Sequence, residues 1–192
     1  MSLSKIRLCS ALALALSAWA MPALAADVSI VATPDPVLQG SGVDLKLMIS
    51  GVTDLYGYNF SLLFDPSLLQ VTSVTEGSFL ATGGTTVFDG GTLDNTSGMI
   101  SFAYDLLTGP VAGVSGAGTL VTIHMNAIGA GTSALSFVAA DTTFVDSSGG
   151  IITVQAIDRT LAVTAVPEPS SYLLLAAGLA GIGAWRRRQA NA

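Results

Sequence analysis

The central part of the chain alternates apolar and polar residues with a period of two. Such alternation is typical of a β-strand with one buried face, because successive side chains of a strand point to opposite sides. Four stretches show it, and the residues that share a face in each are Val43, Leu45, Leu47 and Ile49; Tyr56, Tyr58, Phe60, Leu62 and Phe64; Ile100, Phe102 and Tyr104; and Thr119, Val121, Ile123 and Met125, the last set opposite Leu120, Thr122, His124 and Asn126.

Shorter runs of the same kind predict further strands, separated by turn sequences such as TPDP, ATGG, DNTSG and DSSGG. Helical periodicity is absent from this region. About ten short strands at this spacing indicate an all-β fold in which two antiparallel sheets pack as a β-sandwich. The additional strands are expected at 28–33, 69–74, 85–88, 133–138, 142–145, 151–154 and 160–164.

The first 25 residues have the pattern of a secretory signal peptide. Lys5 and Arg7 precede an apolar run over 8–19, and Ala23 and Ala25 supply the small residues of a cleavage site. An uncleaved helix is the alternative, but the run is short against the roughly 20 residues that a membrane span needs. We expect cleavage after Ala25, an N-terminal signal helix before it, and three parts: 1–25, a sandwich domain over 26–165, and a C-terminal segment over 166–192.

Composition then excludes several classes of function. The one cysteine, Cys9, lies in the signal segment, so disulfides and thiol chemistry are not expected in the mature protein. Between 26 and 166 twelve acids face two basic residues, Lys46 and Arg159, which leaves about ten net negative charges. Nucleic acid is therefore not expected as a partner, because such binding needs lysine and arginine to neutralise phosphate.

The region 28–164 resembles a cohesin domain, the β-sandwich module that binds dockerin modules of polysaccharide-degrading enzymes. The resemblance lies in GYNFSLLFDPSLLQVTSVTEGSF (57–79), in GMISFAY (98–104) and in GAGTLVTIHMNAIGAGTSALSF (116–137). It implies a jelly-roll sandwich like that of carbohydrate-binding modules. It also implies a dockerin-like protein partner in a polysaccharide-related process, with Asn59 at the place of a polar contact residue.

Within that motif, Asp65 and Pro66 predict a turn. Proline fixes the backbone for a turn, and the carboxylate of the aspartate can accept hydrogen bonds from the turn itself. We interpret Asp65 as structural.

No constellation for catalysis stands out, and we expect a protein that is not an enzyme. His124 is the only histidine and is predicted in mid-strand without a triad context. The aspartates lie mostly in turns and mark no carboxylate pair of the kind that glycosidases use. Direct polysaccharide binding stays open as an alternative function, although 26–166 contains no tryptophan and the predicted strand faces place Tyr56, Tyr58 and Tyr104 in sheet packing.

Calcium is the one cofactor that the sequence raises. The stretch DGGTLDNTSG offers Asp89, Asp94 and Asn95 as oxygen ligands within one loop. The spacing is not that of an EF-hand, and an ordinary hairpin loop is the favoured interpretation. No other cofactor or metal site is expected.

The C-terminal segment combines an apolar run with a basic end. The run over 172–185 would be about 21 Å long as a helix, against a hydrocarbon core near 30 Å, so we expect a short transmembrane helix and a temporary tether. The positive-inside rule places Arg186, Arg187 and Arg188 in the cytoplasm, and the acidic domain then lies outside the inner membrane.

The same segment resembles the PEP-CTERM sorting signal of Gram-negative bacteria, which exosortase processes and which is associated with exopolysaccharide and biofilm. The resemblance lies in Pro167, Glu168 and Pro169, in the short apolar run, and in the arginine cluster, in this order. It implies export across the inner membrane and sorting to the cell surface or the extracellular matrix. The expected function is that of a non-catalytic binding or adhesion module.

Overall fold

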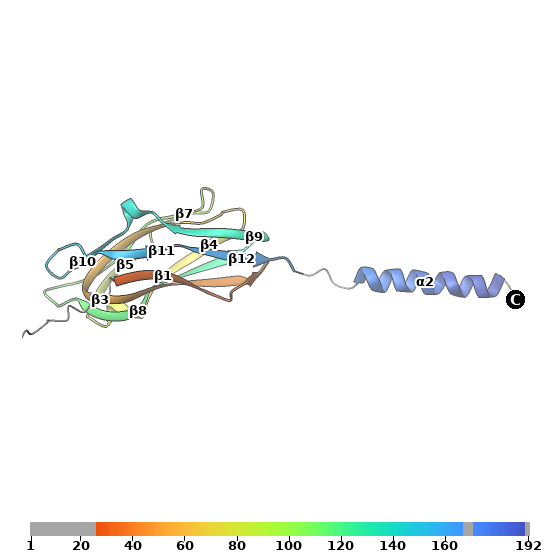
Figure 1. Ribbon diagram of the computed structural model, residues 1–192, viewed down its shortest axis with the longest axis horizontal. Helices are drawn as coiled ribbons and strands as arrows, with labels where there is room; N and C mark the ends of the chain where they lie inside the picture. The colour runs from red at the N-terminus through yellow and green to blue at the C-terminus, as the bar shows by residue number, and fades with distance from the viewer. Residues whose placement is uncertain (1–25, 167–170, 191–192) are drawn as a thin grey trace, which may run out of the picture.

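The computed structural model describes residues 26–166 and 171–190, and within these ranges the chain forms twelve strands and two α-helices (Figure 1). All strands precede Val166. The elements are β1 (Ala26–Thr33), β2 (Val37–Leu38), β3 (Gly42–Leu63), β4 (Leu69–Glu76), α1 (Ser78–Ala81), β5 (Thr86–Asp89), β6 (Thr92–Asp94), β7 (Met99–Leu107), β8 (Val114–Ala127), β9 (Gly131–Phe137), the 3-10 turn η1 (Ala139–Asp141), β10 (Thr143–Asp146), β11 (Val154–Ile157), β12 (Arg159–Thr164) and α2 (Ser171–Ala190).

The long strand β3 passes through both layers of the sandwich. Its first half pairs with β1 and β8, and this first layer continues to β11 on one side and to β4 on the other. Its second half pairs with β7, β10 and β9, and β5 and β6 both extend this second layer beyond β7. The expected antiparallel sandwich is confirmed, apart from the parallel pairs β1–β11 and β2–β12.

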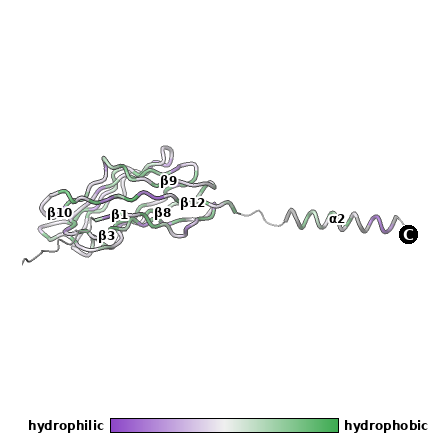
Figure 2. The backbone as a smooth tube through the Cα atoms, in the orientation of Figure 1, coloured by the Kyte–Doolittle hydropathy of each residue, from purple (hydrophilic) through white to green (hydrophobic). Residues whose placement is uncertain are grey.

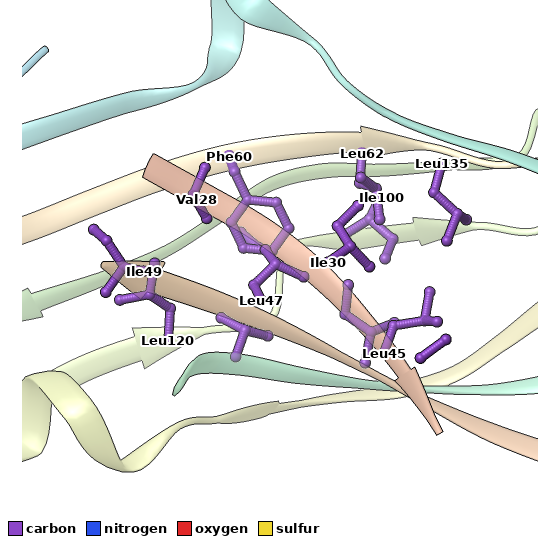
Figure 3. Close-up of a cluster of buried hydrophobic side chains, with 14 of the residues drawn as sticks. Val28, Ile30, Leu45, Leu47, Ile49, Phe60, Leu62, Ile100, Leu120 and Leu135 are labelled. Atoms are coloured by element: carbon purple, nitrogen blue, oxygen red, sulfur yellow. The ribbon is translucent and has the colours of Figure 1, made fainter. Parts of the chain in front are cut away.

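One apolar core lies between the layers. Figure 3 shows side chains of both layers in this core, among them Leu45 and Leu47 of the first and Phe60 and Leu62 of the second, and these four are at most 1% exposed. Removal of this much apolar surface from water is the main stabilising contribution to such a fold. Hydrophobic and hydrophilic residues are interspersed along the strands (Figure 2). This pattern lets one side of a strand face the core while the other faces solvent.

The alternation predicted for β3 is confirmed, but its boundaries differ. The two strands expected at 43–50 and 56–64 are one element, bent at Gly51 and Asp54, which both have positive φ. The alternation in β8 places Leu120 on the polar face, but Leu120 is buried. The reason is a shift in the pairing of β3 with β8 directly beside this residue. The strand expected at 151–154 begins only at Val154.

The turn at Asp65 agrees with its structural interpretation. The Asp65 carboxylate accepts hydrogen bonds from the Ser67 backbone N–H at 2.9 Å and the Ser67 hydroxyl at 2.6 Å. These bonds hold the pKa of Asp65 below its usual value. The Asp65 carbonyl then accepts from the N–H groups of Leu68 and Leu69, which begins β4.

The C-terminal helix α2 is present as expected, and Arg186, Arg187 and Arg188 are exposed on it. The prediction that it crosses a membrane is not supported, since no helix within 26–166 and 171–190 is both long and apolar enough for a span. Ala23, Ala25 and the whole signal segment lie outside the described residues, as do Pro167, Glu168 and Pro169.

Candidate functional site

The outward face of the second layer gathers apolar and aromatic side chains across four adjacent strands. We call it the β7 face. Register places its residues in two rows that run across β10, β3, β7 and β5. One row is Val145, Gly57, Leu106 and Val87; the other is Thr143, Asn59, Tyr104 and Asp89; Phe102 lies next to the second row on β7.

Phe102 and Tyr104 correct the sequence interpretation of β7. Ile100, Phe102 and Tyr104 were expected on one face, but Ile100 is buried while Phe102 is 59% exposed and Tyr104 is 36% exposed. The reason is a β-bulge. The pairing of β7 with β3 shifts between Phe60 and Leu62, and Phe102 adopts a left-handed backbone with φ of 56°. One extra residue in a strand reverses the direction of every side chain beyond it.

The bulge is held by a buried hydroxyl group. Ser61 is fully buried, and its Oγ accepts a hydrogen bond from the backbone N–H of Phe102 at 3.0 Å. The Phe102 amide, which the bulge removes from the ladder, is therefore satisfied. A left-handed conformation costs an L-residue roughly 1–2 kcal/mol, so its retention at an exposed phenylalanine calls for a functional explanation.

A shallow hollow of about 210 Å³ lies in the middle of this face, and Asn59, Tyr104 and Leu106 line it. Leu106 lies across Gly57, where an added Cβ would meet the leucine Cδ1 at 2.5 Å. Gly57 therefore provides the space in which the leucine rests. The hollow offers a partner an apolar depression with polar groups at its side.

Asn59 lies on the β7 face, half-buried, with the outward direction that the alternation predicts. Its Nδ2 donates a hydrogen bond of 2.7 Å to the Asp141 carbonyl, which ties η1 to β3. The amide nitrogen is thus engaged within the protein, and the partner contact expected for Asn59 stays a prediction.

Asp105 lies directly behind this face, in the core, because the bulge turns it inward. It is 1% exposed, and within the described residues neither carboxylate oxygen has a hydrogen-bond partner. Burial, reinforced by the Glu76 charge, raises the pKa of Asp105 to about 7. The neighbouring Tyr58 hydroxyl donates to the Leu120 carbonyl at 2.8 Å, and burial likewise raises the pKa of Tyr58.

The three residues considered as calcium ligands, Asp89, Asp94 and Asn95, form hydrogen bonds within the protein instead. The Asp89 carboxylate accepts from Gly91, and Asp94 accepts from Thr96 and Ser97, which lowers the pKa of Asp94. Asn95 exchanges two hydrogen bonds with the Val71 backbone, at 2.7 and 2.9 Å. Residues 26–166 and 171–190 bring no three metal-ligating side chains of His, Cys, Asp or Glu together. These contacts favour the hairpin interpretation.

His124 lies on the other layer, away from the β7 face. Its Nδ1 lies 2.7 Å from the Asp44 carboxylate and its Nε2 lies 3.3 Å from the Thr75 hydroxyl. All three side chains stand on the outward surface of β3, β4 and β8. The histidine is thus a paired strand residue, as its sequence context indicates.

The fold is a two-layer β-sandwich, and its second layer presents an outward face with exposed apolar side chains. A cohesin domain model matches residues 29–163, so the chain belongs to the cohesin family. A PEP-CTERM protein-sorting motif matches residues 165–188, which implies export and sorting to the cell envelope. Cohesin domains are non-catalytic protein-interaction modules, and the protein fits an exported binding module.

Solved cohesin structures share this fold. One is a type II cohesin–X-dockerin complex from Acetivibrio cellulolyticus (15% identity, TM-score 0.58, 72% of this chain and 99% of that chain). Another is a cohesin module of a family 33 glycoside hydrolase from Clostridium perfringens (10%, 0.59, 74% and 98%). A third is a non-cellulosomal cohesin from Archaeoglobus fulgidus (18%, 0.52, 76% and 96%). None of the curated proteins matches this sequence.

Proposed function

We propose that this protein is a secreted cohesin that binds a dockerin-like protein partner through the β7 face in a polysaccharide-related process. The observation that carries the proposal is the concentration of outward apolar side chains beside Asn59 on one sheet of a cohesin fold. Exposed apolar surface of this kind marks interaction sites on soluble proteins. Several structures with this fold are complexes with dockerins.

Calorimetric titration of the purified protein with a panel of dockerin modules tests the partner class. We expect Leu106→Ser to weaken binding at least tenfold, because it removes the apolar floor of the hollow. Val31→Ser is the matched control, since Val31 is a similarly exposed aliphatic residue on the first layer. A protein that retains neither a dockerin nor a secreted protein of its host would contradict the proposal.

We also propose that exosortase processes the C-terminal segment. The support is the match to the sorting motif over 165–188 and the three exposed arginines after the apolar part of α2. We expect the processed protein at the cell surface or in the extracellular matrix. The intact mass of surface-released protein is the test, and a species that still carries Arg186 to Arg188 would overturn it.

Direct polysaccharide binding is the second candidate, and one observation favours it. Phe102 and Tyr104 both face outward, Tyr104 lies in a row with Asn59 and Asp89, and aromatic rings next to polar groups can contact sugars. Affinity electrophoresis in gels that contain the exopolysaccharide of the host should then retard the wild type, and Tyr104→Ala should abolish the retardation. Equal mobility with and without the polysaccharide would exclude this candidate.

A further inference from the structure

Strand β7 exposes two aromatic residues and buries an acidic one, which is the reverse of what their side chains favour. Without the bulge, Phe102 and Tyr104 would share the inward direction of Ile100, and Asp105 would face solvent. The bulge instead exposes two aromatic rings and buries a carboxyl group that has no partner within the described residues. Both changes oppose folding, because burial of aromatic surface stabilises a protein and burial of an unpaired acid destabilises it.

Two other segments are adapted to this bulge. The buried Ser61 hydroxyl accepts from the Phe102 amide. On the opposite side of β7, Gly91 has φ of 73°, and a Cβ there would lie 2.4 Å from the Ser101 carbonyl oxygen. Gly91 therefore allows the chain between β5 and β6 to pass close to the bulge. Three separate parts of the sequence thus maintain an arrangement that costs stability, which is expected where a strained conformation serves function.

The charges around these rings have a single sign. Asp89 lies in the row of Tyr104, and Asp141 adjoins Asn59 through its carbonyl. The sandwich has two basic side chains, and neither belongs to the β7 face. Lys46 pairs in register with Val31 and Thr122 on the first layer, and Arg159 is held by the Asp35 carboxylate and the Ile30 carbonyl.

We propose that Phe102 and Tyr104 are the anchor residues of the β7 face, and that they receive a protein partner which presents an apolar side chain flanked by lysine or arginine. The inference rests on the proposed function and specifies the chemistry of the partner. Aromatic residues dominate binding energy at the centres of protein interfaces, and complementary charge at the rim sets orientation and association rate.

A phage-displayed library of randomised helical peptides, selected on the purified protein, tests this chemistry directly. We expect the enriched peptides to carry an aromatic or aliphatic residue close to two or more lysines or arginines. Their binding should weaken in 0.5 M NaCl, because salt screens exposed charge pairs. Peptides without an excess of basic residues, or no enriched peptides at all, would overturn the proposal.

Phe102→Gly is the decisive variant, because glycine adopts positive φ without strain and therefore keeps the bulge while it removes the ring. We expect this variant to melt no lower than the wild type and to bind the selected peptides at least tenfold more weakly. Tyr104→Ala should act in the same direction, and Val31→Ser should bind as the wild type does. Unchanged binding by Phe102→Gly would overturn the anchor role.

Two further outcomes separate this inference from the proposed function. A dockerin that binds Phe102→Gly as tightly as the wild type but fails to bind Leu106→Ser would keep the proposed function and overturn the anchor. Retardation of the wild type by the exopolysaccharide of the host, lost in Phe102→Gly, would assign the rings to sugar and overturn the protein partner.

Discussion

At the scale of single residues, Asp105 couples the geometry of the β7 face to stability. Its folded pKa of about 7 exceeds the usual 3.8, so the unfolded chain loses this proton at lower pH than the folded protein. The carboxyl therefore costs the fold nothing below pH 3.8, destabilises it progressively as pH rises towards 7, and has a constant effect above that.

Asp105→Asn should remove this pH dependence, because an amide does not ionise. The quantity to follow is the free energy of unfolding of the variant minus that of the wild type. We expect this difference to be about 1–3 kcal/mol larger at pH 8 than at pH 4, because only the wild type is destabilised as the pH rises. Denaturant titrations at a series of pH values measure it. The change of this difference with pH is diagnostic, whereas its absolute value is not. The buried amide also has unpaired polar groups, and their cost is the same at pH 4 and at pH 8. Parallel pH profiles would show that Asp105 is ionised in the folded protein.

At the scale of elements, the bend of β3 depends on Asp54. Its carboxylate accepts from the Gly113 backbone at 2.7 Å and from the Ser147 hydroxyl at 2.7 Å, and these bonds lower the pKa of Asp54. The residue has φ of 58°. Aspartate tolerates this conformation better than alanine does, and glycine adopts it freely.

Asp54→Ala should therefore unfold at a lower temperature than Asp54→Gly, although both variants lose the same hydrogen bonds. Thermal unfolding followed by circular dichroism ranks the two, with Thr53→Ala as the exposed neighbour that should match the wild type. The opposite order would mean that backbone strain is not significant at the bend.

The hairpin of β5 and β6 is attached to β4 by Asn95. Asn95→Ala removes both hydrogen bonds to the Val71 backbone and should cost about 1–2 kcal/mol of unfolding free energy. Urea titration measures the change, and Thr92→Ala on the same hairpin, whose exposed side chain makes no hydrogen bond within the described residues, should change it little. If added calcium stabilised the wild type but not Asn95→Ala, the hairpin interpretation would be wrong.

Most strands were predictable from the sequence, whereas the short strands β2 and β6 and the defects within strands were not. Strand β3 was predictable because its alternation of apolar and polar residues is a local pattern, visible within a few consecutive residues. The reversal at Phe102 depends on Ser61 and Gly91, which lie 41 and 11 positions away, and the sequence of β7 alone contains no sign of either contact. The sequence analysis missed the β7 face for this reason, although the motif around Asn59 had drawn attention to one residue that lies on it.

At the scale of the whole molecule, the core of residues 26–166 lies in the sandwich. Within the described part of the chain, all residues of the buried apolar cluster lie between Ala26 and Val163. The match to the cohesin domain also ends at residue 163, and the match to the sorting motif begins at residue 165. Among the described residues, the C-terminal segment therefore contributes nothing to the core beneath the β7 face.

A chain that ends at Val166 should accordingly keep the fold of the longer protein. We expect their unfolding free energies to agree within about 0.5 kcal/mol. Leu45→Ala shows the sensitivity of the measurement, since loss of this fully buried side chain should cost about 2–5 kcal/mol in either background. A shortened chain that unfolds well below the full one would mean that the tail supports the sandwich, and that processing releases a weakened module. Equal stability means that the tail can be removed while the sandwich and its β7 face stay folded, as the proposed sorting route requires.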